Sequence, residues 1–253
     1  PAIQYTILIF MFLAGINYTV LYYGLVGKFK KVWGSDEFKA YIILVGILIV
    51  AVTTTIYCST DSGLEKSFRD ATFQIISIVT TTGFASADYT SWTPGLSLLF
   101  FFLLFVGACA GSTSGGIKLI RHLVFFKNSF LEFKRLLHPN AIIRTKIDGR
   151  IVPSKVMTHI LVFLLLYLML FFFGSLVMVI ILDDFDRPLL SAISAVATSL
   201  GNVGPALADL SPVNNFAAVP ASGKCFLTFL MLLGRLELFT ILVIFTPYFW
   251  KTN

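Results

Sequence analysis

Long apolar runs separated by short polar segments dominate the chain. Each of four uninterrupted runs is long enough to cross a bilayer as a helix, which takes roughly 20 residues. They cover residues 5–26, 38–57, 156–182 and 225–249. A fifth run, residues 96–126, is also long enough, but a glycine-rich stretch at 107–116 interrupts it. The pattern predicts an all-α integral membrane protein.

Two apolar segments, 68–79 and 188–197, are too short to span a bilayer. Each is followed by small polar residues and glycine, and each lies between long apolar runs. We therefore expect two re-entrant helices that enter the membrane and stop. Non-helical backbone at membrane depth is tolerated only when it is buried in protein or lines a water-filled path. An extended return segment with free carbonyls can replace the water shell of a dehydrated cation.

The two short segments also resemble each other in sequence. A shift of 118 residues places Thr80 on Thr198 and Gly83 on Gly201. This alignment predicts a duplicated unit of span, re-entrant helix and span, with extended selectivity-filter loops after each re-entrant helix. The candidate ion ligands are mainly backbone carbonyls of Thr80, Thr81, Thr82, Gly83, Thr198, Ser199, Leu200, Gly201 and Asn202.

Composition supports the membrane assignment, because 57% of residues are hydrophobic and only 13% are charged, against roughly 25% charged in soluble domains. If successive predicted spans cross the membrane in opposite directions, 14 of the 19 Lys and Arg residues lie on the same side. The positive-inside rule makes this side cytoplasmic. Acidic residues concentrate on the other side. They form either an acidic vestibule that attracts cations or merely the complement of the basic bias. The chain begins with Pro1 at the edge of an apolar run, so we expect a piece of a longer polypeptide.

The stretch 107–116 allows two interpretations. The phosphate-binding motif G-x-x-x-x-G-K-[ST] fails because position 117 is isoleucine, and a hydrolase elbow fails because no serine has glycines two residues before and after it. What remains is either a close helix-packing site of small residues or a broken helix whose middle is a movable gate. The gate interpretation involves Gly107, Gly111, Gly115, Gly116 and Arg235.

Catalytic chemistry is not indicated. Away from the ends of the four uninterrupted spans only Arg235 and Glu237 carry charge, and two residues apart they point to different sides of a helix. The three cysteines are isolated, which predicts neither a disulfide framework nor a metal clip. The basic linker 128–155 lacks the aromatic residues or motifs of nucleic-acid binding, so anionic lipid or a cytoplasmic partner is the expected ligand.

Four segments together resemble the TrkH/KtrB superfamily of potassium transporters. They are residues 80–84 (TTTGF), 199–205 (SLGNVGP), 111–118 (GSTSGGIK) and 234–237 (GRLE). The resemblance covers essentially the whole chain. It implies a polypeptide of four span–hairpin–span repeats around a central pore. On that basis 1–37 would complete a preceding repeat and its linker, 38–127 would be one pore repeat, 128–155 a cytoplasmic linker and 156–253 a second pore repeat.

The resemblance also implies the biology. Potassium would be the transported ion, with no organic cofactor, and the protein would be a multi-pass protein of the bacterial inner membrane. Two hairpins cannot close a filter alone, so the absent N-terminal half of the same polypeptide would supply the others. A homodimer and a cytoplasmic nucleotide-binding ring subunit similar to TrkA are the implied protein partners. Arg235 would face the pore and donate to carbonyls of the 107–116 loop, holding it closed. The alternative is a structural salt bridge of Arg235 to an acid in the absent half.

Overall fold

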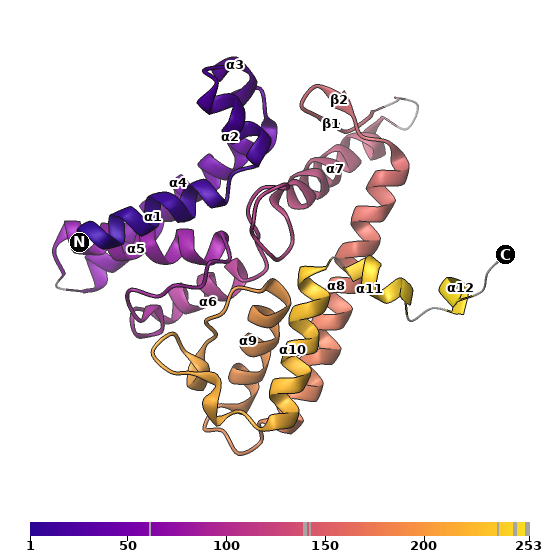
Figure 1. The fold of residues 1–253 in the computed structure, drawn as a ribbon. Coiled ribbons are helices and arrows are strands. Elements are labelled where there is room, and N and C mark those ends of the chain that lie inside the picture. The colour runs from indigo at the N-terminus through magenta and orange to yellow at the C-terminus, as the bar shows by residue number, and fades with distance from the viewer. Residues whose placement is uncertain (61, 139–140, 142, 237, 245–246, 251–253) are drawn as a thin grey trace.

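The computed structural model describes residues 1–60, 62–138, 141, 143–236, 238–244 and 247–250. Its helices form two groups joined through the middle of the chain (Figure 1). The first group contains α1 (Ala2–Ala14), α4 (Asp36–Ser59), α5 (Leu64–Val79) and α6 (Pro94–Leu103). The second contains α8 (Ser154–Ile181), α9 (Pro188–Gly201) and α10 (Ala221–Arg235). The remaining elements are α2 (Tyr18–Leu25), α3 (Phe29–Val32), η1 (Tyr89–Ser91), α7 (Leu119–Leu137), β1 (Lys146–Ile147), β2 (Arg150–Ile151), η2 (Ala208–Leu210), η3 (Phe216–Ala218), α11 (Leu238–Ile244) and α12 (Pro247–Trp250).

Two of the predicted spans are confirmed as long apolar helices. By length and hydropathy, α4 with 24 residues and α8 with 28 residues can each cross a membrane. The N-cap of α4 is Ser35, whose hydroxyl accepts the Phe38 amide at 3.4 Å. Much of the surface of both helices is apolar and exposed, as expected for helices that contact lipid or other membrane helices.

Two other predicted spans are not single straight helices. The run 5–26 is divided into α1 and α2, which meet at an angle of 110°. Asn17 makes the break, because its side chain accepts the Thr19 amide at 2.8 Å and caps α2 as a new helix. The run 225–249 is also divided, since α10 ends at Arg235 and α11 begins at Leu238. Hydropathy averages over a run and therefore misses such breaks.

The helix that crosses the centre of the chain is interrupted as predicted. Helix α6 ends at Leu103 and α7 begins at Leu119, with no helix between them. Helix α7 then continues to Leu137, further than the predicted limit of residue 126. The remainder of the predicted polar linker contains the small antiparallel hairpin of β1 and β2.

The two short helices are the most deeply buried elements. Helix α5 has 16 residues and α9 has 14, and ten residues of each are buried. Both lengths exceed the predicted segments, but at 1.5 Å per residue they reach only about 21–24 Å, short of a hydrocarbon core of about 30 Å. Helix α5 packs mainly against α4 and α1, and α9 against α8 and α10.

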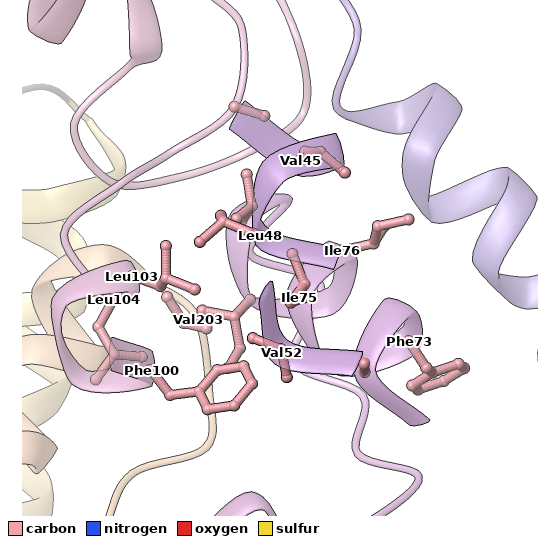
Figure 2. Packing of buried hydrophobic residues seen from close by; sticks show 14 of the residues in the cluster. Val45, Leu48, Val52, Phe73, Ile75, Ile76, Phe100, Leu103, Leu104 and Val203 are labelled. Atoms are coloured by element: carbon pink, nitrogen blue, oxygen red, sulfur yellow. The ribbon is translucent and has the colours of Figure 1, made fainter. Parts of the chain in front are cut away.

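Each group has its own apolar core, and the core of the first group also takes in residues of the second. Val203, from the loop after α9, lies among Phe100 and Leu103 of α6, Leu104 directly after α6, and Val52 of α4 (Figure 2). Ala197 and Leu207 of the second group belong to the same cluster. The segments that follow the short helices are therefore held together by burial of side chains from both groups.

Candidate ion-pathway site

Helices α5 and α9 end in the same hydrogen-bonded turn. At the end of α5, the Thr82 amide donates to the carbonyl of Ser77 at 2.9 Å, and at the end of α9, the Val203 amide donates to the carbonyl of Thr198 at 3.0 Å. Inside each turn a second bond joins residues three apart, from the Thr81 amide to the Ile78 carbonyl and from the Asn202 amide to the Ser199 carbonyl. This pair of bonds is the Schellman arrangement, which satisfies the last carbonyls of a helix.

The backbone angles repeat as well. Thr81 and Asn202 both have φ of 54°, and Gly83 and Gly204, two residues further on, have φ of 80° and 118°. The turn requires a residue with left-handed backbone angles, and residues with a side chain adopt these angles only at an energetic cost. The left-handed residues of the two turns therefore recur 121 residues apart.

This repeat corrects the predicted register. The structure relates the two units by a shift of 121 residues, which places Gly83 on Gly204, not on Gly201. Residues Thr198 to Gly201 form the last turn of α9, not an extended loop, and Thr80 has right-handed helical angles. The predicted extended conformation is therefore wrong at Thr80 and at residues 198–201. Both helices extend through these positions and end only at the Schellman turn.

Hydroxyl groups at equivalent positions brace the returning segments. The Ser77 hydroxyl donates to the Phe84 carbonyl at 2.6 Å. The Thr198 hydroxyl, 121 residues later, accepts the Gly204 amide at 2.8 Å. Each helix thus fixes the backbone of the loop that follows it. A Ser or Thr six residues before a glycine is the sequence signal that identifies the 121-residue register.

The two turns touch each other. A side chain at Gly83 would overlap the carbonyl oxygen of Val203, and a Cβ at Gly204 would lie 3.6 Å from the Cα of Gly83. Backbone from both units is therefore exposed to the same small region, where carbonyls and the Thr80 and Thr82 hydroxyls, 2.8 Å apart, are the available oxygen atoms. No cluster of three His, Cys, Asp or Glu side chains capable of holding a metal occurs among the described residues.

The segment between α6 and α7 lies directly against both turns. Its two ends pair, since the Gly107 amide donates to the Ile117 carbonyl at 2.9 Å and the Leu119 amide to the Ala108 carbonyl at 3.0 Å. We call residues 107–116 the glycine loop. Of the predicted gate glycines, Gly111 and Gly116 have φ of 69° and 64°.

Contacts of the glycine loop join it to both short helices. The Gly115 amide donates to the Thr81 hydroxyl at 2.6 Å. A Cβ at Gly115 would lie 2.6 Å from the Gly201 carbonyl oxygen, and one at Gly107 would overlap the Gly115 carbonyl. The two interpretations of this stretch are therefore compatible. The helix is broken here, and the glycines of the unwound loop pack closely against the ends of α5 and α9.

Arg235, the last residue of α10, reaches the same loop. Its Nη1 donates to the Thr113 carbonyl at 3.0 Å, which is the type of contact that the sequence predicted. Beside it, a hollow of about 250 Å³ is lined by residues 112–116 together with Lys118, Arg121 and Arg235. Three cations thus surround one face of the loop. Glu237 lies outside the described residues.

A buried carboxylate anchors the opposite face of the glycine loop. Glu37, at the start of α4 and only 7% exposed, accepts the Ala110 amide at 2.6 Å and the Ile120 amide at 3.2 Å. It therefore holds the loop and the first turn of α7 together. Asn17, at the α1–α2 break, donates to the Ala110 carbonyl at 2.6 Å.

Sequence reasoning missed both anchors. Glu37 lies 73 residues from Ala110 and Asn17 lies 93 residues from it. Nothing in a local pattern pairs residues at such separations.

The remaining predicted site residues lie in or directly after α9. Ser199 and Leu200 are buried within α9, and the Asn202 side chain donates to the Met231 carbonyl of α10 at 3.0 Å. The latter contact connects the second turn to the helix that carries Arg235.

Comparison with known proteins agrees with this architecture. The profile of the TrkH family, described as "Cation transport protein", matches residues 1–251. The chain belongs to the TrkH family. Among curated members, it is 37% identical to the Trk system potassium uptake protein TrkH of Salmonella typhimurium over 99% of the chain and 51% of that protein. It is 30% identical to the Trk system potassium uptake protein TrkG of Escherichia coli K12 over 96% of the chain and 49% of that protein.

A solved structure of a family member has a similar fold over the length of this chain. The crystal structure of the potassium transporter TrkH from Vibrio parahaemolyticus superposes with a TM-score of 0.89 at 33% identity, covering 99% of this chain and 53% of that one. The chain thus spans about half the length of the curated relatives it matches. Its family and its two membrane-length helices place it in a protein of the bacterial inner membrane.

Proposed function

We propose that this chain forms two pore hairpins of a potassium transporter, and that the ion passes the paired turns at Gly83 and Gly204. The observation that carries the proposal is the repetition of one Schellman turn at the ends of two short buried helices, with the two turns in contact. Each short helix is then a re-entrant pore helix, and the potassium uptake function of similar proteins is the natural one for such an arrangement.

The chemistry at the turns suits a dehydrated monovalent cation. A helix C-terminus carries about half a negative charge, and α5 and α9 both end at the turns. Carbonyl and hydroxyl oxygens supply neutral ligands, which replace the hydration shell without binding the ion too tightly to release it. The proposed ligands come from residues 80–83 and from the equivalent residues 201–204, with Thr198 bracing the second set.

We further propose that the glycine loop is the gate. It lies against both turns, where its Gly115 amide donates to the Thr81 hydroxyl and its Thr113 carbonyl accepts from Arg235, and Glu37 and Asn17 hold its other part at Ala110. The positive charge of Arg235, Lys118 and Arg121 around the neighbouring hollow opposes entry of potassium while the loop is in place. Movement of the loop would break the hydrogen bond between Arg235 and Thr113 and free the Arg235 side chain to leave the path.

Two hairpins enclose only part of a filter, so the proposal includes further hairpins from a preceding half of the same polypeptide. A homodimer and a cytoplasmic nucleotide-binding ring subunit similar to TrkA complete the proposed assembly. The basic segment 128–155 is the proposed docking surface for that subunit. The activity is transport and not enzymatic catalysis.

The test is ion uptake into vesicles that contain the full-length transporter. Wild-type protein should take up potassium in preference to sodium, and Gly83→Ser should reduce this preference about tenfold. Gly46→Ser is the matched control, because a Cβ at Gly46 in α4 would meet no atom within 4 Å. The proposal is wrong if correctly inserted Gly83→Ser protein retains the wild-type ratio of potassium to sodium uptake.

A further inference from the structure

A long groove runs between α7 and α8, away from the two turns. Its larger section has a volume of about 1150 Å³ and is bounded by α4, α6, α7 and α8. Its lining is almost entirely apolar and includes Ile43, Ile47, Phe126, Phe130, Leu165 and Leu168. Each of these six side chains is more than half exposed, so the described part of the chain leaves the groove open.

The apolar groove continues into a polar hollow. This second section, about 620 Å³ in volume, is lined by Asn128, Arg144 and Thr158 among others. Lys127 of α7 and Leu161 of α8 belong to the apolar section. They lie next to Asn128 in the chain and one helical turn beyond Thr158, respectively, so the two sections follow each other along the same pair of helices.

Positive charge is concentrated in the segment that lines the polar hollow, and of its cations Arg144 is the one that lines the hollow itself. Between residues 143 and 158 there are four cations, Arg144, Lys146, Arg150 and Lys155, and one acid, Asp148. All four cations are exposed, and within the described residues none of their side chains has an ion-pair or hydrogen-bond partner. The Asp148 carboxylate accepts the Asp36 amide at 2.6 Å and so points toward the start of α4.

The length of the apolar section matches one leaflet of a bilayer. On α8 it extends from Leu161 to Phe171, which corresponds to about 15 Å of helix. Half of a hydrocarbon core of about 30 Å is the same distance. A phospholipid whose headgroup lies at the polar end would therefore place its acyl chain along the whole apolar section.

We propose that this groove binds an anionic phospholipid of the cytoplasmic leaflet, with its phosphate at Arg144 and an acyl chain against α7 and α8. Arginine is well suited to the phosphate, because its guanidinium forms bidentate charge-assisted hydrogen bonds. The charge on the polar end selects an anionic headgroup over a zwitterionic one. A second copy of this chain would carry the same four cations and so lacks the complementary charge. The proposal does not depend on potassium conduction, and it assigns Arg144, within the segment 128–155, to lipid and not to the cytoplasmic subunit.

The experiment measures lipid binding to the purified full-length transporter by native mass spectrometry. Phosphatidylglycerol should bind more tightly than phosphatidylcholine. Arg144→Gln should weaken phosphatidylglycerol binding about tenfold while leaving phosphatidylcholine unchanged. Lys30→Gln is the control for loss of an exposed cation, because Lys30 lies in α3, outside both sections of the groove. It should leave both lipids unchanged.

A second variant tests the apolar section without altering charge. Leu168→Trp should fill the groove and weaken both lipids, whereas Ile180→Trp should not, because Ile180 is 79% exposed on the same helix and outside the groove. Equal binding of the two lipids, or equal effects of Arg144→Gln and Lys30→Gln, would overturn the proposal. So would a Leu168→Trp variant that dissociates a dimer without changing lipid binding, since a second copy would then occupy the groove.

Discussion

Replacing Gly204 distinguishes the structural register of the two turns from the register expected from sequence. Gly204 has φ of 118°, while the nearest atom to an added Cβ is 3.6 Å away, so Gly204→Ser creates conformational strain without a clash. Such strain costs about 1–3 kcal/mol. Since 1.4 kcal/mol corresponds to a factor of ten in affinity, relief of the strain by rotation of the turn would alter the preference for potassium over sodium about tenfold.

Gly201→Ser should behave differently. Gly201 lies within α9 at ordinary helical angles, and an added Cβ would lie 2.6 Å from the Leu104 carbonyl oxygen. The substitution therefore forces α9 away from Leu104, and the overpacking should lower the free energy of unfolding by about 1–3 kcal/mol. We expect lower thermal stability of the purified transporter, with the ion preference of the correctly folded fraction unchanged.

The assay is paired uptake of potassium and sodium into vesicles, normalised to correctly inserted protein, with Gly46→Ser as the control. The reasoning predicts a reduced ratio for Gly204→Ser and a wild-type ratio for Gly201→Ser. The opposite outcome, a reduced ratio for Gly201→Ser alone, would refute the 121-residue register and restore the alignment of Gly83 with Gly201.

Three further predictions concern the glycine loop. Arg235→Ala removes the hydrogen bond to Thr113 and should raise potassium flux at unchanged thermal stability, measured as flux per inserted protein; a fall in both would make Arg235 a structural tie. Removing residues 112–114 should raise flux and reduce its dependence on the cytoplasmic subunit, whereas poor insertion and lower flux would indicate a packing role only. Glu37→Ala leaves two amides without their acceptor and should lower stability by about 1–3 kcal/mol for each one that stays buried, with much of the loss recovered in Glu37→Gln; equal melting temperatures of wild type and Glu37→Ala would contradict the anchoring role.

The membrane class and the main divisions of the chain could be predicted from sequence because they depend on local properties. Helices α4 and α8 are continuous apolar runs, and α5 and α9 are recognisably too short to span. The interruption before α7 was visible in the density of glycine at 107–116. In each case the physical cause, transfer of side chains into hydrocarbon or unfavourable helix propensity, acts within a few residues of the position concerned.

Only the tertiary structure determined which residues of the two units correspond. Sequence similarity placed Gly83 on Gly201, but the hydrogen bonds that end each helix place it on Gly204. The anchoring of the glycine loop by Glu37 and Asn17 was equally invisible. Both side chains bond Ala110 across 73 and 93 residues of chain, and a linear pattern contains no information about which distant groups burial will bring together.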